Sequence, residues 1–134
     1  MKTGDFAYFD GTISTEFDKN KKLKGIVVVI FDHNAFAMHP ELIEDVDWYD
    51  GKKECEEIFA EMPNLRQCQA IYDNKEVLNK SLTAAGFAPI DDEIVWSSTE
   101  LDSNYAWLFS MNFGNRSSYN KYYNNYCVRP VLAL

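Results

Sequence analysis

Large apolar side chains recur at every second position between residues 105 and 113 of this chain. They are Tyr105, Trp107, Phe109, Met111 and Phe113. Successive side chains of a β-strand point to opposite faces, so this spacing predicts a strand that turns one apolar face to the core. We expect Trp107, Phe109 and Met111 to anchor the strand, and we expect the residues of the other parity to present changeable groups to solvent.

The remaining pattern predicts an α+β domain. The expected elements are strands at 6–9 and 25–31, helical regions at 50–62 and 65–85, and strands at 93–98, 105–113 and 128–133. Asp50 is expected to cap the first helix, Pro63 to end it, and Gly86 to end the second helical region. Strand, helices and then several strands, with no linker between them, indicate one domain over residues 1–134.

The chain has a formal net charge of −8, and its acidic residues are unevenly placed. Residues 41–61 hold nine acidic residues and two lysines, whereas residues 103–134 hold no acid and three bases. A solvated helix face explains the acidic part. Binding to nucleic acid needs a basic surface, so the overall charge argues against a nucleic-acid partner. No apolar run reaches the roughly 18 residues of a membrane-spanning helix, so no membrane span is expected.

Cysteine and histidine residues are too few and too far apart to indicate a metal site. Cys55, Cys68 and Cys127 are widely spaced, and the only imidazoles belong to His33 and His39. We interpret the cysteines as buried free thiols, and the two histidines as solvated groups of an irregular segment. We therefore expect no cofactor, no metal ion and no disulfide framework.

The C-terminal part of the chain is rich in asparagine, tyrosine and serine. These three types make up 15 of the 24 residues from 103 to 126, and five of the eight tyrosines lie there. Tyrosine offers a large, rigid contact surface, and serine and asparagine offer adaptable hydrogen bonds, a mixture also found in antibody loops. Half-buried packing is the alternative for each tyrosine, but the neighbours Tyr122 and Tyr123 cannot both face the core of an extended segment. We predict a surface that binds a protein or carbohydrate ligand, built from Asn104, Tyr105, Asn112, Ser117, Tyr119, Asn120, Tyr122, Tyr123, Asn124 and Tyr126.

Fixed-looking motifs frame this surface and continue upstream. They are Val95-Trp96-Ser97-Ser98-Thr99-Glu100, Ala106-Trp107, Gly114-Asn115, Lys121 and Val128-Arg129-Pro130-Val131, with residues 4–12, 25–27 and 71–86 before them. Together they resemble the Fibrobacter-type major paralogous domain family of gut and environmental bacteria. The resemblance implies a C-type-lectin-like fold, in which two helical regions pack on antiparallel strands and the opening segment lies beside the C-terminal strand. The chain departs from the family at residues 62–66, where a Gly-Trp-Arg-Leu-Pro-like turn is usual.

Some members of that family are target proteins of diversity-generating retroelements, which randomise adenines in asparagine codons. The resemblance implies a variable region at about 101–127 in this chain. The positions expected to change are 102–105, 108, 110, 112, 113, 117–120 and 122–126, and each holds a residue type that such a codon permits. Trp107, Met111 and Lys121 are types that it forbids, and they occupy frame positions.

The sequence therefore predicts a non-enzymatic ligand- or receptor-binding protein, diversified at its C-terminal end and displayed on a phage or a cell surface. No GxSxG, HExxH, P-loop or dinucleotide motif indicates an enzyme. Two alternatives remain open: a static carbohydrate- or protein-binding module of a bacterial surface protein, and a structural virion protein with a tyrosine-rich subunit interface. The first residues carry no signal-peptide pattern, so we expect the chain to be virion-associated, or cytoplasmic before display. The oligomeric state is not predicted.

Overall fold

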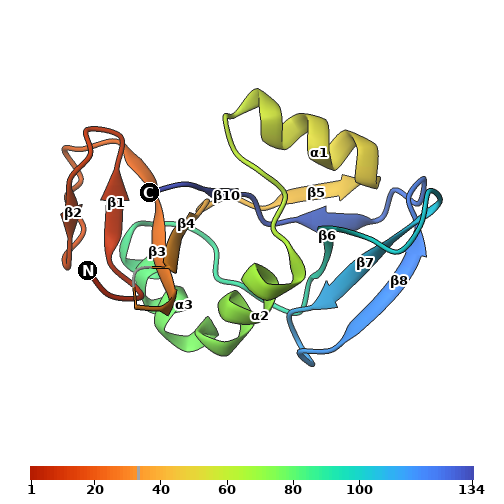
Figure 1. The fold of residues 1–134 in the computed structure, drawn as a ribbon. Coiled ribbons are helices and arrows are strands. Elements are labelled where there is room, and N and C mark those ends of the chain that lie inside the picture. The colour runs from red at the N-terminus through yellow and green to blue at the C-terminus, as the bar shows by residue number, and fades with distance from the viewer. Residues whose placement is uncertain (33) are drawn as a thin grey trace.

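The first and last strands of the chain belong to one antiparallel sheet (Figure 1). The structure is a computed structural model that describes residues 1–32 and 34–134. In the order β10-β4-β3-β1-β2, the strands of this sheet are Val131–Leu132, Asn34–Met38, Leu23–Phe31, Phe6–Tyr8 and Ile13–Ser14. Both ends of the chain are thus tied into the same sheet, but β10 pairs with β4 and not with β1. The prediction that the opening segment lies directly beside the C-terminal strand is therefore wrong.

A second sheet carries the asparagine- and tyrosine-rich segment. In the order β5-β9-β6-β7-β8, its strands are Ile43–Val46, Tyr126–Val128, Ile94–Glu100, Tyr105–Ser110 and Arg116–Asn120. All pairs are antiparallel except β6 with β9, which are parallel. The predicted α+β class is confirmed, since the described residues form ten strands and three helices in one compact unit.

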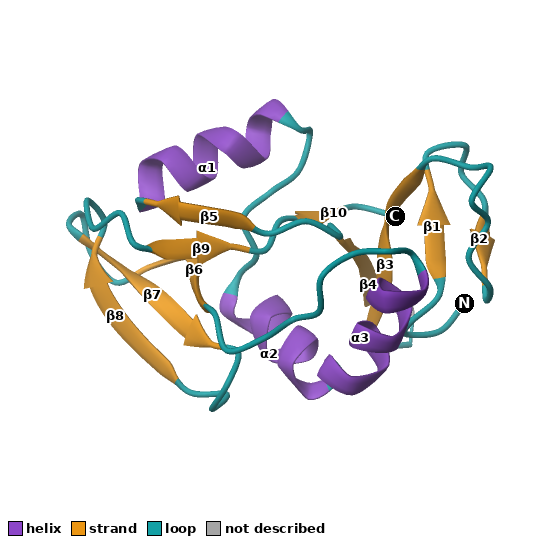
Figure 2. Cartoon of the chain, turned by 180° about the vertical axis from the view of Figure 1, so that it is seen from behind, coloured by secondary structure: helices purple, strands orange, loops and turns teal. Residues whose placement is uncertain are grey.

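The three helices cover the sheets on different sides. Helix α1 (Trp48–Glu57) contacts β5 and β6, helix α2 (Leu65–Asp73) contacts β3, β6 and β7, and helix α3 (Lys75–Ala84) contacts β3. Both views show α2 between the two sheets, with α1 on the opposite side of the second sheet (Figures 1 and 2). One core cluster therefore joins both sheets around α2 and α3, and a second cluster lies between α1 and the second sheet.

The first helix begins and ends earlier than the predicted range of 50–62. Its N-cap is Asp47, whose side chain accepts a hydrogen bond from the backbone N–H of Asp50 at 2.7 Å. Asp50 is therefore inside the first turn and is not the cap. The helix ends at Glu57, well before Pro63, in a turn whose residue Phe59 has a left-handed φ of 58°.

The second helical region agrees with the predicted range, although it is two helices joined at Asn74. Asn64 caps α2 through a capping box with Gln67. Gly86 follows α3 with a φ of 85°, as a helix-ending glycine does. The segment predicted as irregular contains strand β4, and His39 directly after it is half-buried, with its Nδ1 accepting from the backbone N–H of Glu41 at 3.0 Å. His33 lies outside the described residues.

Candidate functional site

The residues predicted to bind a ligand all lie at the surface, to different degrees. Asn104, Tyr105, Asn112, Ser117, Tyr119, Tyr122, Tyr123 and Asn124 are exposed, and Asn120 and Tyr126 are half-buried. The ring of Tyr122 is the most open of the tyrosines, with an exposed fraction of 71%. Core packing therefore does not account for these residues.

Three of the tyrosine rings form a cluster at one end of the second sheet. Between ring centroids, Tyr123 lies 4.8 Å from Tyr119 and 4.9 Å from Tyr126, and Tyr119 lies 5.7 Å from Tyr126. The ring of Tyr126 rests edge-on against the buried ring of Trp96, at 5.4 Å. Aromatic pairs at these separations attract one another. The cluster is thus fixed to the core on its inner side and open to solvent on its outer side.

Helix α1 adds a tyrosine that the sequence did not predict for this surface. Tyr49, in the first turn of α1, lies 5.1 Å from Tyr122 and 5.3 Å from Trp48 between ring centroids. Its position in an acidic segment favoured a plain solvated helix, and nothing in the local pattern indicated its partner. We call Tyr49, Tyr119, Tyr122, Tyr123 and Tyr126 the tyrosine surface.

Lys121 is the buried support beneath the tyrosine surface. Its exposed fraction is 2%, and its Nζ donates to Glu100 Oε1 at 2.6 Å and to the carbonyl oxygens of Asp102 at 2.9 Å and Ser103 at 3.1 Å. The ammonium also lies 4.7 Å from the ring centroid of Trp48. All three donors of the ammonium thus have acceptors, and one side chain joins the two loops at this end of the sheet.

Backbone hydrogen bonds fix the same loops. The N–H of Lys121 donates to the carbonyl of Asn104, and the N–H of Trp48 donates to the carbonyl of Lys121, both at 2.9 Å. Asn120 accepts twice, from the N–H of Tyr122 at its side-chain oxygen and from the N–H of Tyr123 at its carbonyl. The tyrosines therefore stand on an ordered backbone, so a ligand has little loop entropy to overcome.

Strand β7 is buried on both faces, which corrects the predicted alternation. Phe109 is fully buried against the cluster around α2, whereas Leu108, with an exposed fraction of 1%, lies in the cluster beneath α1. The expectation that Leu108 faces solvent is wrong, because Leu108 packs in the cluster beneath α1. The exposed residues of the predicted variable region therefore lie at the end and the edge of the sheet, and not on one face of this strand.

The three residues predicted to anchor β7 differ in burial. Phe109 and Met111 are buried, as expected, but Trp107 is only half-buried. Tyr105 and Phe113, at the two ends of the apolar stripe, have exposed fractions of 41% and 76%. Deep anchoring by tryptophan comes instead from Trp96, whose Nε1 donates to the carbonyl of Val46 at 3.0 Å.

Asn112 and Ser117 lie away from the tyrosine surface. The pairing of β7 with β8 runs from Tyr105 opposite Asn120 to Phe109 opposite Arg116. Asn112 is in the turn beyond that second pair, so the whole hairpin separates it from the tyrosines. Ser117 is the second residue of β8, two residues before Tyr119. The structure thus brings together Asn104, Tyr105, Tyr119, Asn120, Tyr122, Tyr123, Asn124 and Tyr126, and does not bring Asn112 to them.

The tyrosine surface is uncharged at its aromatic centre. Burial raises the pKa of Tyr126, and the neighbouring hydroxyls of Tyr123 and Tyr119 raise it further. The Tyr126 phenol therefore remains protonated at neutral pH, and it can donate and accept a hydrogen bond. Rings with neutral hydroxyls suit stacking and hydrogen bonding to a protein or a sugar.

The three cysteines are free, and two of them are buried as predicted. Burial raises the pKa of Cys55 and of Cys68 to about 12. Cys127 is half-buried, and burial raises its pKa as well. Because the thiolate is the nucleophilic form, these environments disfavour thiol chemistry at neutral pH.

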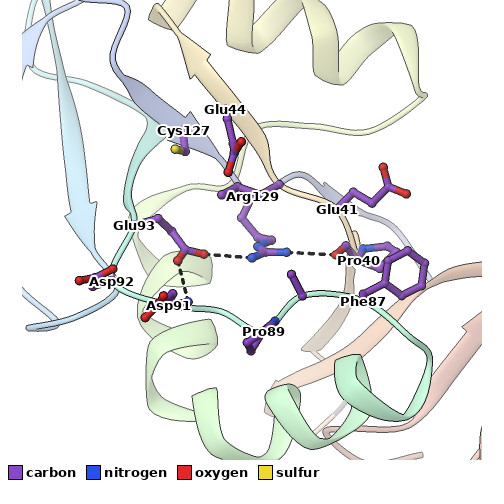
Figure 3. Close-up of a pocket in the computed structure, with 12 residues that line it drawn as sticks. Pro40, Glu41, Glu44, Phe87, Pro89, Asp91, Asp92, Glu93, Cys127 and Arg129 are labelled. Atoms are coloured by element: carbon purple, nitrogen blue, oxygen red, sulfur yellow. Dashed lines mark hydrogen bonds and ion pairs between the residues drawn. The ribbon is translucent and has the colours of Figure 1, made fainter.

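A separate pocket of about 590 Å³ opens between the segments that precede β5 and β6 (Figure 3). The buried guanidinium of Arg129 donates to Glu93 Oε1 at 3.0 Å and to the carbonyl of Pro40 at 3.2 Å. Glu41, Glu44, Asp91 and Asp92 line the rim. The two bonds join distant segments, so a structural role accounts for Arg129. The pocket shares no residue with the tyrosine surface.

Within residues 1–32 and 34–134, no helix has the length and apolar character needed to span a membrane. Over the same residues, no group of three or more His, Cys, Asp and Glu side chains is placed to hold a metal ion. No protein-family model matches the chain, and no curated protein is significantly similar to it in sequence. What the tyrosine surface does must then follow from its own geometry and chemistry.

Proposed function

We propose that this domain is a non-enzymatic binding protein that holds a protein or carbohydrate ligand at the tyrosine surface, and that a retroelement diversifies this surface. The supporting observation is how burial divides residues 102–126. The positions expected to change are exposed or half-buried, with Leu108 as the exception. Four of the positions between them, Ala106, Phe109, Met111 and Lys121, have exposed fractions of 2% or less, whereas Trp107 and Gly114 are half-buried and Asn115 and Arg116 are exposed. Substitution at the first group changes contacts, and the four buried residues maintain the fold.

The proposed binding follows from the chemistry of the surface. Exposed aromatic rings on an ordered backbone are frequent hot spots, because they bury a large area with few rotors to immobilise. Asn104 and Asn124, which are exposed beside the rings, supply amide donors and acceptors. We propose display on a phage or cell surface, where such a surface meets its ligand directly.

Sequencing of the coding segment in a growing population tests the diversification. We expect substitutions at adenines in the codons of the exposed positions, and an unchanged codon for Lys121. A near-identical, asparagine-rich copy of the segment beside a reverse transcriptase gene is expected in the genome. A uniform population without such a copy would contradict diversification, and a static binding module would then be the better proposal.

Replacing Tyr122 and Tyr123 together by alanine tests the binding. We expect a loss of roughly 2 kcal/mol or more in binding free energy, with the free energy of unfolding lowered by only about 1–2 kcal/mol, because Tyr123 loses its aromatic contacts with Tyr119 and Tyr126. Binding of labelled protein to intact bacterial cells and to a glycan array measures the first quantity, and urea denaturation measures the second. Phe9→Ala, which removes an exposed ring outside the predicted variable region, is the matched control and should bind as the wild type does.

A further inference from the structure

Helix α1 ends in a backbone turn that ordinarily contains glycine. The N–H of Ala60 donates to the carbonyl of Cys55 at 2.8 Å, and the N–H of Phe59 donates to that of Glu56 at 3.1 Å. These two bonds define a Schellman motif. Its left-handed position is occupied by Phe59, with a φ of 58°. Glycine is favoured there because a Cβ atom crowds the following carbonyl oxygen in this conformation.

The side chain of Phe59 does not compensate for that conformation by packing. Its exposed fraction is 93%, the highest among the exposed large apolar residues of the described chain. A strained backbone and an aromatic ring in water are both unfavourable for the fold. Backbone strain that does not stabilise the fold indicates that Phe59 has a functional role.

Phe59 lies at the rim of a pocket of about 490 Å³. Trp48, Ala60 and Met62 line its apolar part, and each of them is nearly buried. Its polar part consists of Lys52, Glu56, Glu61, Ser98 and Glu100. A concave site of this size, lined by aromatic side chains and a few polar groups, is typical of a ligand-binding pocket.

The charges around this pocket favour a cation. The ring of Trp48 already attracts two ammonium groups, those of Lys121 at 4.7 Å and Lys52 at 5.3 Å from its centroid. Neither Glu56 nor Glu61 takes part in an ion pair within the described residues. Aromatic faces and unpaired carboxylates in one pocket select a positive group over a neutral one.

We propose that this pocket binds the guanidinium group of an arginine side chain presented by a partner protein. A planar cation stacks on the ring of Phe59 and pairs with the carboxylate of Glu61 or Glu56, and its aliphatic stem lies on Met62. Arginine suits the site better than lysine, since stacking and bidentate pairing both need a planar group. The site stands whether or not the tyrosine surface binds a ligand or is diversified.

Titration of the full chain with N-acetyl-arginine methylamide, followed by NMR, tests the proposal. We expect saturable millimolar binding that shifts the indole N–H of Trp48 and the amide of Phe59. The matched control is N-acetyl-citrulline methylamide, which has nearly the same shape without the charge and should cause little shift. Equal shifts with both compounds, or no shift at this pocket, would overturn the proposal.

Variants locate the site on the protein. Phe59→Ala should weaken binding of the arginine probe by about three- to tenfold, and Glu61→Gln should weaken it as well. Lys52→Gln should tighten binding, because it removes a competing ammonium from the pocket. Phe113→Ala, which removes another highly exposed phenylalanine away from this pocket, should have no effect. If Phe59→Ala bound the probe as tightly as the wild type, the assignment would be wrong.

Discussion

The tyrosine surface and the rim residue Phe59 are both aromatic and exposed, but they are supported in opposite ways. The tyrosine rings contact one another and the buried ring of Trp96, and Lys121 holds the loops beneath them. Phe59 is held by the backbone turn at the end of α1 alone. The tyrosine surface therefore rests on buried residues that do not belong to it. A ring supported only by its backbone contributes one fixed contact.

The strongest test of this comparison is at the buried strand beneath the tyrosine surface. Leu108→Asn should lower the free energy of unfolding by roughly 3–5 kcal/mol, because it leaves a cavity and buries an amide without partners. Tyr122→Asn makes an exposed change of similar chemistry and should cost no more than about 0.5 kcal/mol. Urea denaturation measures both. If Leu108→Asn were as stable as the wild type, position 108 would belong to the changeable set after all.

Lys121→Met removes the support while it keeps most of the side-chain volume. The carbonyls of Asp102 and Ser103 lose their donor, so we expect a loss of about 1–3 kcal/mol in unfolding free energy. We also expect faster hydrogen exchange in the loops at 101–104 and 121–125, with no change at Phe59. Lys75→Met is the control, because Lys75 donates to the carbonyl of Met111 at 2.9 Å and does not contact these loops. Unchanged exchange in both loops would show that Lys121 is not their support.

Local patterns predicted β1, β3, β6 and β7 and the helical regions, whereas β2, β4, β5 and β8 had no predicted counterpart. Apolar spacing and the breaker residues gave the strands at 6–9 and 25–31 and the helices before Gly86. The pattern misjudged β7, because the parity expected to face solvent holds Ala106, Leu108 and Ser110, and this mixture does not reveal that α1 covers that face. It also placed the end of α1 too late, because a left-handed turn at Phe59 contradicts local preference.

The candidate site could be predicted only in part. Composition indicated the tyrosines of residues 119–126, and the frame pattern marked Lys121 as fixed. Two contributions depend on contacts between distant segments, and neither has a local signal. One is the approach of Tyr49 to Tyr122, and the other is the closure of Lys121 onto Glu100. Asn112 shares the composition of the site but is separated from it by the pairing register.

Phe59→Gly should raise the free energy of unfolding, whereas Leu108→Asn and Lys121→Met should lower it. Glycine adopts the left-handed conformation without strain, and the exposed ring contributes no packing, so we expect a gain of about 1 kcal/mol in unfolding free energy. Thermal and urea denaturation measure this gain, which should accompany a loss of binding to the arginine probe. Phe113→Gly is the control, since Phe113 does not have a positive φ and glycine there should not stabilise the fold. A destabilised Phe59→Gly variant would mean that the ring supports the fold.

The smallest expected effect concerns the contacts among the tyrosines themselves. Burial, with Tyr123 and Tyr119 nearby, raises the pKa of Tyr126 above its unfolded value of about 10. A raised pKa means that the folded state favours the neutral phenol. The resulting stability is fully present below the unfolded pKa and is lost as the pH rises through the folded one. The difference in tyrosinate absorbance between the wild type and Tyr126→Phe isolates this titration. It should move to lower pH when Tyr119 and Tyr123 are both replaced by phenylalanine, and an unmoved titration would mean that burial alone sets the pKa.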